Sequence, residues 1–198
     1  MDIILASSSV ARSALMKRLQ IPFKVFPPNI DESPLPFELP NRYVTRLAYQ
    51  KALAIALKFP KSIVIGADQV CVYKQAFYGK PKTFSQAFMQ LKEFSNKKVY
   101  FYGAVSVIYL KNKSVQKKLH ITTVYYKKLS SPLIRAYLNK DKPYSCAGSL
   151  RSESLGLMLC KKIISPDPSA LIGMSLIDIS QMLNIIKPNF ILHYSIKK

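Results

Sequence analysis

The chain has 198 residues, 49% of them hydrophobic, with 30 Lys and Arg residues against 10 Asp and Glu residues. This length suits one sizeable domain, and no apolar run reaches the roughly 18 residues that a membrane-spanning helix needs. Three cysteines without CxxC spacing disfavour a disulfide framework or a structural zinc site. His120 and His193 leave little material for a histidine-based triad, and the opening residues lack the basic leader of a signal peptide, so we expect a cytoplasmic protein.

The net charge of +20 favours anionic partners, and nucleic acid is one interpretation because basic patches bind phosphate backbones. The lysines are scattered in pairs, however, rather than grouped on one arm or helix. The pairs are Lys97-Lys98, Lys117-Lys118, Lys127-Lys128, Lys161-Lys162 and Lys197-Lys198. The sequence shows no clustered face of basic and aromatic residues, so we expect a small anionic substrate before a nucleic acid.

The first half of the chain alternates between apolar strands and amphipathic helices. The expected elements are a strand at 2–6, a helix from Val10, a short strand at 23–26, a helix at 41–58 and a strand ending at Asp68-Gln69. A serine-rich turn, Ser7-Ser8-Ser9, precedes the first helix, and a proline-rich loop occupies 27–40.

The second half adds a helix capped by Thr83, two alternating strands at 98–110 and 117–126, and a helix from Ser130 or Ser131. A small polar loop at 146–156 and a closing helix at 175–186 follow, with a turn or cap at Asp167-Pro168-Ser169. The pattern predicts one α/β domain over residues 1–198. We expect a mixed, twisted sheet flanked by helices, with two lobes around a central cleft.

Asp68 is the most informative residue, because it closes the apolar run that begins at Ile63. Burying a carboxylate costs on the order of several kcal/mol unless it is paired, hydrogen-bonded or metal-bound. Asp68 therefore either caps the next turn or holds a cation and accepts a proton from water.

Several other residues have a functional and a plain interpretation. Ser7 and Arg12 suit an anion at the start of a helix, or an ordinary cap beside a solvated arginine. Glu32 could join Asp68 in holding Mg²⁺, whereas Asp31 beside it reads as a solvated turn residue. Glu153 could accept hydrogen bonds from a guanine edge or stay solvated.

Seven motifs match one known family in order and spacing across essentially the whole chain. They are Leu5-Ala6-Ser7-Ser8-Ser9 with Arg12, Asp31-Glu32-Ser33-Pro34, Arg46-Leu47-Ala48 to Lys51-Ala52, Gly66-Ala67-Asp68-Gln69-Val70, Gly79-Lys80-Pro81, Cys146-Ala147-Gly148-Ser149 through Ser152-Glu153, and Asp167-Pro168 to Leu171-Ile172-Gly173. Together they resemble the Maf-type nucleoside triphosphate pyrophosphatases, with an ITPase-like fold. Asp68-Gln69 and the Ser-Glu pair resemble the branch that acts on 7-methyl-GTP.

The resemblance implies cleavage between the α and β phosphates, which removes modified nucleotides from the pool, with Mg²⁺ or Mn²⁺ as cofactor. It implies Asp68 as proton acceptor, Glu32 and Asp68 as metal ligands, and a possible homodimer without a membrane partner. Phosphate binding falls on Ser7, Arg12, Lys51 and Lys80. Base choice falls on Ala11, Gln69 and Glu153.

The chain departs from the family at Val10 and Ser13, where a proline and a second arginine are usual, and at Ala11, which is often aromatic in this branch. Two rival functions follow. The common branch acts on dTTP and UTP, which Gln69 and Glu153 disfavour. A basic nucleic-acid-binding module would bind in a salt-sensitive way that survives loss of Asp68.

Overall fold

The computed structural model describes residues 2–190, so His193 lies outside the described residues. The helices are α1 (Val10–Lys17), α2 (Pro40–Ala56), α3 (Phe84–Phe94), α4 (Ser131–Asp141) and α5 (Leu176–Ile186). The strands are β1 (Ile3–Ala6), β2 (Lys24–Val25), β3 (Ile63–Tyr73), β4 (Ala76–Tyr78), β5 (Lys98–Tyr109), β6 (Ser114–Tyr126) and β7 (Cys160–Ile164). Within 2–190, no helix has the length and apolar character needed to cross a bilayer.

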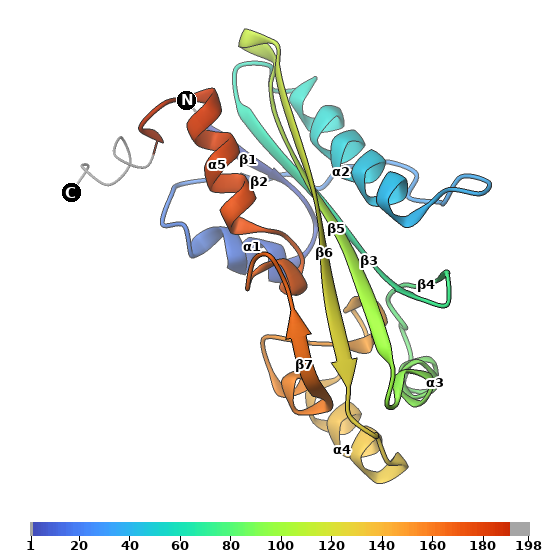
Figure 1. The fold of residues 1–198 in the computed structure, drawn as a ribbon. Coiled ribbons are helices and arrows are strands. Elements are labelled where there is room, and N and C mark those ends of the chain that lie inside the picture. Colours follow the sequence, from blue (N-terminus) through green and yellow to red (C-terminus); the bar gives the residue numbers. More distant parts are fainter. Residues whose placement is uncertain (1, 191–198) are drawn as a thin grey trace. The chain divides into compact units, whose positions relative to one another are not determined.

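The strands form one sheet in the order β2-β1-β3-β5-β6-β7, and β4 pairs with β3 (Figure 1). β1 runs parallel to β2 and β3, whereas the β3–β4 and β6–β7 pairs are antiparallel. The prediction of a mixed sheet flanked by helices is therefore confirmed. The single domain and the central cleft stay predictions.

The described residues divide into two compact units. Unit 1 takes the described parts of Met1–Asp68, Gly103–Leu119 and Asp167–Lys198, and unit 2 takes Gln69–Tyr102 and His120–Pro166. The long strands β3, β5 and β6 are each divided between the units, with one segment in unit 1 and the other in unit 2.

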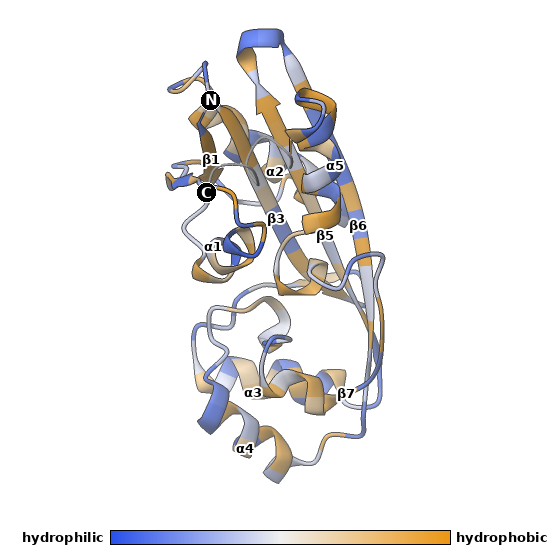
Figure 2. Cartoon of the chain, turned by 90° about the vertical axis from the view of Figure 1, so that its left-hand side faces the viewer, coloured by the Kyte–Doolittle hydropathy of each residue, from blue (hydrophilic) through white to orange (hydrophobic). Residues whose placement is uncertain are grey.

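Unit 1 has helices on both faces of its strands, with α1 and α5 on one face and α2 on the other (Figure 1). Side chains alternate between the two faces, so Ile3 and Leu5 pack toward α1 and α5 while Ile4 packs toward α2. Strands covered on both faces read as continuous apolar runs, which is how β1 and the first part of β3 appear in Figure 2.

The start of α5 depends on one buried carboxylate. Asp167 accepts hydrogen bonds from the backbone N–H and hydroxyl of Ser169, the hydroxyl of Ser175 and the backbone N–H of Ile177, at 2.6–2.8 Å. Burial raises the pKa of Asp167, but these hydrogen bonds outweigh burial and leave its pKa lowered. The predicted turn or cap at this position is confirmed.

In unit 2, α3 packs against α4 and contributes Phe94 to an aromatic core. The buried ring of Phe94 lies 4.9 Å from Tyr78 and 5.5 Å from Tyr126, measured between ring centroids. Thr83 and Ser130 cap the two helices as expected. Gly148 has a φ of 59°, and a Cβ there would lie 2.6 Å from the Sγ of the buried Cys71, so this loop needs glycine to pack closely.

The sequence misplaces the start of β6 and does not predict two short 3-10 turns. β6 begins at Ser114 rather than at residue 117, because the turn after β5 needs only residues 110–113. The expected loop at 146–156 contains a 3-10 turn at Ala147–Ser149 and the start of another at Leu155–Leu159.

Candidate active site

Asp68 lies in the middle of β3 and not at its end, which corrects the prediction from sequence. The strand continues to Tyr73 because Cys71, Val72 and Tyr73 pair with β4. Asp68 is 6% exposed, and its Oδ1 accepts a 2.7 Å hydrogen bond from Nζ of Lys51. The buried carboxylate is therefore paired, as its burial requires.

Lys51 reaches Asp68 because α2 lies unusually close to β3. A Cβ on Gly66 would lie 2.3 Å from the carbonyl oxygen of Ala48 and 2.7 Å from the backbone nitrogen of Ala52. Gly66 and Asp68 are two residues apart and so share one face of the strand. The small residues at this contact bring the helix turn that carries Lys51 over the carboxylate.

Glu32 joins the same ammonium from the proline-rich loop. Its Oε2 accepts a 2.7 Å hydrogen bond from Nζ of Lys51, although the Glu32 side chain is 55% exposed. One buried ammonium thus holds two carboxylates, and the three groups together carry one negative charge. The carboxylate cluster (Glu32, Lys51 and Asp68) lies wholly within unit 1.

The loop that carries Glu32 is held by contacts that the sequence analysis missed. Nε and one Nη of Arg46 donate to both carboxylate oxygens of Glu38 at 2.6 Å, and the same Nη donates to the carbonyl of Ser33 at 3.1 Å. Asp31 is exposed, and its carboxylate accepts from the backbone N–H of Ser33, which lowers the pKa of Asp31. The expected turn at Asp31 is confirmed.

Tyr43 is a second residue that the sequence analysis missed. Its hydroxyl donates to the carbonyl of Glu32 at 3.0 Å. Burial raises the pKa of Tyr43 to about 12, and the charges of Asp68 and Glu32 act in the same direction. Tyr43 lies two helical turns before Lys51 and therefore on the same side of α2. This spacing is the sequence signal that could have pointed to Tyr43.

The serine turn lies at the same end of the neighbouring strand. β1 and β3 are parallel, and their last paired residues are Ala6 and Gly66. Ser7 is the first residue after this pair on β1, and Asp68 is the second residue after it on β3. The Ser7 side chain is buried, and its Oγ accepts from the backbone N–H of Ser9 at 3.1 Å.

Arg12 is anchored on the first helix. Ser9 caps α1 by accepting from the backbone N–H of Arg12 at 3.3 Å, and Nε of Arg12 donates to the carbonyl of Gly173 at 3.1 Å. Ala11 beside it is half-buried. The hydrogen bond at Nε fixes the plane of the guanidinium, whose two Nη groups are further donors.

The remaining predicted residues belong to unit 2. Gln69 is half-buried on β3, where strand alternation points it to the face opposite Asp68. Lys80 is exposed, and the carbonyl of Gly79 before it accepts from the backbone N–H of Gly148 and from Nε2 of Gln90, both at 3.3 Å.

Glu153 is exposed on an anchored loop. The backbone N–H of Arg151 donates to the Tyr137 hydroxyl at 2.9 Å, and the hydroxyl of Ser154 donates to Asp141 at 2.7 Å. The backbone on both sides of Glu153 is therefore held in place, while its carboxylate faces water.

The carboxylate cluster suits a divalent cation in its donor chemistry. Residues 2–190 contain no group of three or more His, Cys, Asp and Glu side chains placed for a metal. Two carboxylates that converge on one ammonium are nevertheless the number of protein ligands that Mg²⁺ commonly takes when phosphate and water supply the rest.

Comparison with known proteins identifies the class to which this fold and this cluster belong. The family model described as Maf-like protein matches residues 2–186, and the chain belongs to the Maf family. Two curated relatives, from Nitrosococcus oceani and Thiobacillus denitrificans, are each named 7-methyl-GTP pyrophosphatase. They are 40% and 41% identical over 181 residues, which is 91% of this chain and 91% and 90% of theirs.

Among solved structures, the Staphylococcus aureus Ham1 protein matches 65% of this chain and 73% of its own, with 14% identity and a TM-score of 0.46.

Proposed function

We propose that this protein hydrolyses 7-methyl-GTP to 7-methyl-GMP and pyrophosphate. The observation that carries the proposal is the buried Lys51 that binds both Glu32 and Asp68, in a chain about 40% identical to relatives named for this activity. The nucleotide pool on which such an enzyme acts is in the cytoplasm, and we place the protein there.

Asp68 is the proton acceptor of the reaction. The water oxygen forms a bond to the α phosphorus, the bond from this phosphorus to the α–β bridging oxygen breaks, and pyrophosphate leaves with that oxygen. The proton of the water passes to Asp68, a transfer that typically contributes 10²–10⁴-fold to the rate. Asp68 suits this role because its burial keeps competing water away while Lys51 fixes its orientation.

Glu32 and Asp68 would hold Mg²⁺ or Mn²⁺. When bound, the cation polarises phosphate oxygens and lowers the pKa of its water. The exposed side chain of Glu32 lets it exchange partners when a nucleotide arrives, whereas Asp68 is fixed on the strand.

Cationic groups offset the charge of the triphosphate. Lys51 has three N–H donors, of which two bind the carboxylates, and a phosphate oxygen suits the third. Arg12, held through Nε, presents its Nη groups as a phosphate fork beside Ser7. Lys80 adds a cation from its turn in unit 2.

Glu153, Gln69 and Ala11 determine which base is accepted. Methylation at N7 makes the guanine ring cationic, so a carboxylate such as Glu153 gains an attraction that GTP lacks. Gln69 carries an amide that matches a purine edge, although strand alternation points it to the face of β3 opposite Asp68. Ala11, where an aromatic residue is frequent in this branch, leaves the base without a stacking partner at that position.

A substrate panel tests the proposal. Pyrophosphate release is measured from 7-methyl-GTP, GTP, dTTP and UTP, with Mg²⁺, with Mn²⁺ and with EDTA. We expect 7-methyl-GTP to have the highest kcat/KM and EDTA to abolish turnover. A preference for dTTP or UTP would instead assign the protein to the pyrimidine branch of the family, and turnover in EDTA would exclude the metal.

A further inference from the structure

The solvent-facing side of the unit 2 strands carries three tyrosines. On β5, Tyr100 and Tyr102 are half-buried and alternate with the fully buried Val99 and Phe101. On β6, Tyr125 is half-buried between the fully buried Val124 and Tyr126, and Tyr126 packs against Phe94 of α3. The side chains that face the helices are thus the buried set, and the three tyrosines lie on the opposite face.

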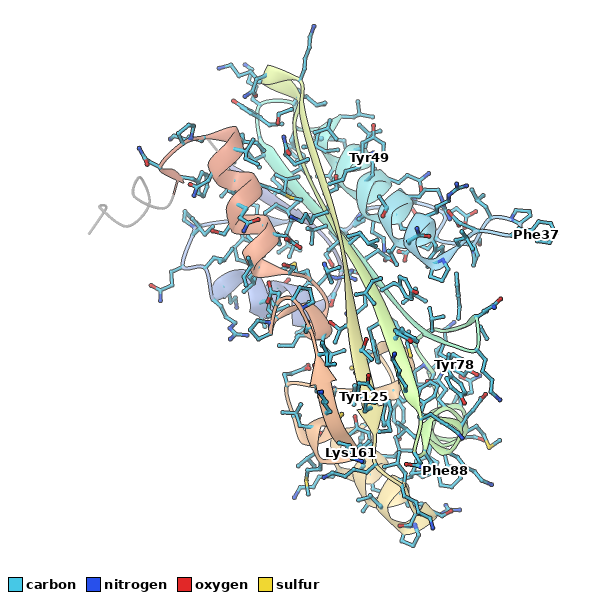
Figure 3. All side chains as sticks on the ribbon, viewed as in Figure 1. Phe37, Tyr49, Tyr78, Phe88, Tyr125 and Lys161 are labelled. Carbon is cyan, nitrogen blue, oxygen red and sulfur yellow. The ribbon has the colours of Figure 1, made fainter. Side chains whose placement is uncertain are left out.

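Lysines stand beside these rings on the same face. Nζ of Lys98 lies 4.9 Å from the ring centroid of Tyr100 and 5.8 Å from that of Tyr125, which brings residues of β5 and β6 together. Tyr125 pairs directly with Lys162 of β7, so these two side chains also share a face. Figure 3 labels Tyr125 on β6 and, on the adjacent β7, Lys161, which precedes Lys162 in the chain.

The three tyrosines are partly exposed on this face, and Lys98 beside them is exposed. Its ammonium lies near the rings of both Tyr100 and Tyr125. A hydrogen bond with the Tyr100 hydroxyl raises the pKa of Lys98, which keeps the ammonium charged at neutral pH.

We propose that this tyrosine–lysine face (Lys98, Tyr100, Tyr102, Tyr125 and Lys162) binds single-stranded nucleic acid without reading its sequence. Partly exposed aromatic rings on neighbouring strands can stack unpaired bases of any kind, and flanking cations bind the phosphates. Bases in a duplex are already stacked on each other and do not offer their faces.

Charge favours this occupant over a second copy of the chain. Unit 2 carries fourteen Lys and Arg residues against three acidic ones, and β5, β6 and β7 contain no Asp or Glu. A symmetric contact of the face with itself would bring its lysines together without partners, whereas a phosphodiester chain supplies the missing negative charge.

Fluorescence anisotropy of the full chain with a 5′-labelled 15-mer of deoxythymidine, and with one of uridine, tests the proposal. We expect Tyr100→Thr and Tyr125→Thr each to weaken binding of both oligomers about tenfold, because each removes one stacking ring. Tyr125→Phe keeps the ring and should bind like the wild type. The plot of log affinity against log salt concentration has a negative slope. Lys98→Gln and Lys162→Gln should each make this slope shallower by about 0.7.

A matched pair elsewhere in unit 2 provides the control. Arg135 of α4 lies 5.0 Å from the ring of Phe88 on α3, so Phe88→Ala and Arg135→Gln remove an aromatic ring and a cation away from the face. Both should bind like the wild type, and pyrophosphate release should be unchanged in every variant. If a threonine variant fails to fold by circular dichroism, the lysine salt slopes and Tyr125→Phe still test the face.

Four results would overturn the proposal. They are undiminished binding by folded tyrosine variants, equal or tighter binding of a blunt duplex, displacement of the oligomer by a saturating triphosphate, and a dimer in sedimentation that Tyr100→Thr dissociates. The last result would assign the face to contact between copies.

Discussion

Lys51 and Asp68 in unit 1 are buried on a helix and a strand, whereas Lys80 and Glu153 in unit 2 are exposed in loops. The buried pair is fixed by the close contact of α2 with Gly66, so it moves only if the helix moves. Near the exposed residues, backbone groups of Gly79 and Arg151 are held by hydrogen bonds. Reaction chemistry needs fixed groups, whereas recognition tolerates loops that vary, and the roles proposed for Asp68 and Glu153 follow this difference.

Of the substitutions that test this difference between the units, one at Asp68 should have the largest effect on activity. Asp68→Asn keeps one oxygen that can accept from Lys51 but cannot take up a proton, so kcat should fall about 10³-fold. Steady-state pyrophosphate release measures the effect, and circular dichroism checks the fold.

Asp31→Asn is the matched control for Asp68, because Asp31 is an exposed carboxylate beside Glu32. It should leave kcat near the wild-type value. Near-normal turnover in Asp68→Asn would remove this residue from the chemistry, whatever the control shows.

Asp167 tests how far unit 1 depends on buried charge outside the site. Asp167→Asn replaces an acceptor of four hydrogen bonds by a group that also donates, and it should lower the free energy of unfolding by about 3 kcal/mol at neutral pH. Urea unfolding measures this loss, with Asp2→Asn, which removes an exposed ion pair, as the control of small effect.

The same residue predicts a pH dependence. The pKa of Asp167 in the folded protein is below its ordinary value of 3.8, so its stabilisation is complete above 3.8 and lost as the pH falls through the lower folded value. The difference in unfolding free energy between the wild type and Asp167→Asn should therefore shrink in this acidic range. A difference that stays constant down to acid pH would contradict the assignment.

Gly66 sharpens the comparison by changing packing without changing charge. Gly66→Ala places a Cβ against the backbone of α2, which should cost about 2 kcal/mol of stability and move Lys51 relative to Asp68. Gly79→Ala is the control in unit 2, since nothing lies within 4 Å of a Cβ there. Equal thermal midpoints for the two variants would show that the close helix contact does not position the site.

The sequence predicted the order of helices and strands because their apolar periods and caps are local signals, as at Thr83 and Ser130. It placed Asp68 at a strand end because the polar Gln69 interrupts the apolar run, while the alternation that continues to Tyr73 depends on pairing with β4. Glu32 and Lys51 were singled out separately, but their shared contact depends on the loop clamp between Arg46 and Glu38.

The tyrosine–lysine face shows the same limit more clearly. Lys98, Tyr125 and Lys162 are more than 25 residues apart from one another in sequence, and only the register of β6 with β7 and the cation–ring contacts bring them together. The scattering of lysines along the sequence therefore did not predict whether they cluster in space. Strand pairing brings distant residues together, and residue spacing along the chain does not encode it.

Glu153 carries the smallest expected effect, because its carboxylate is exposed and water screens its charge. Glu153→Gln should lower the ratio of kcat/KM for 7-methyl-GTP over GTP about fivefold, which corresponds to the ~1 kcal/mol of a charge pair in water. The effect should come from 7-methyl-GTP alone, since GTP lacks the ring charge. Glu93→Gln removes another exposed carboxylate of unit 2 and should leave the ratio unchanged, so that an unaltered ratio in Glu153→Gln would rule out charge as the basis of the preference.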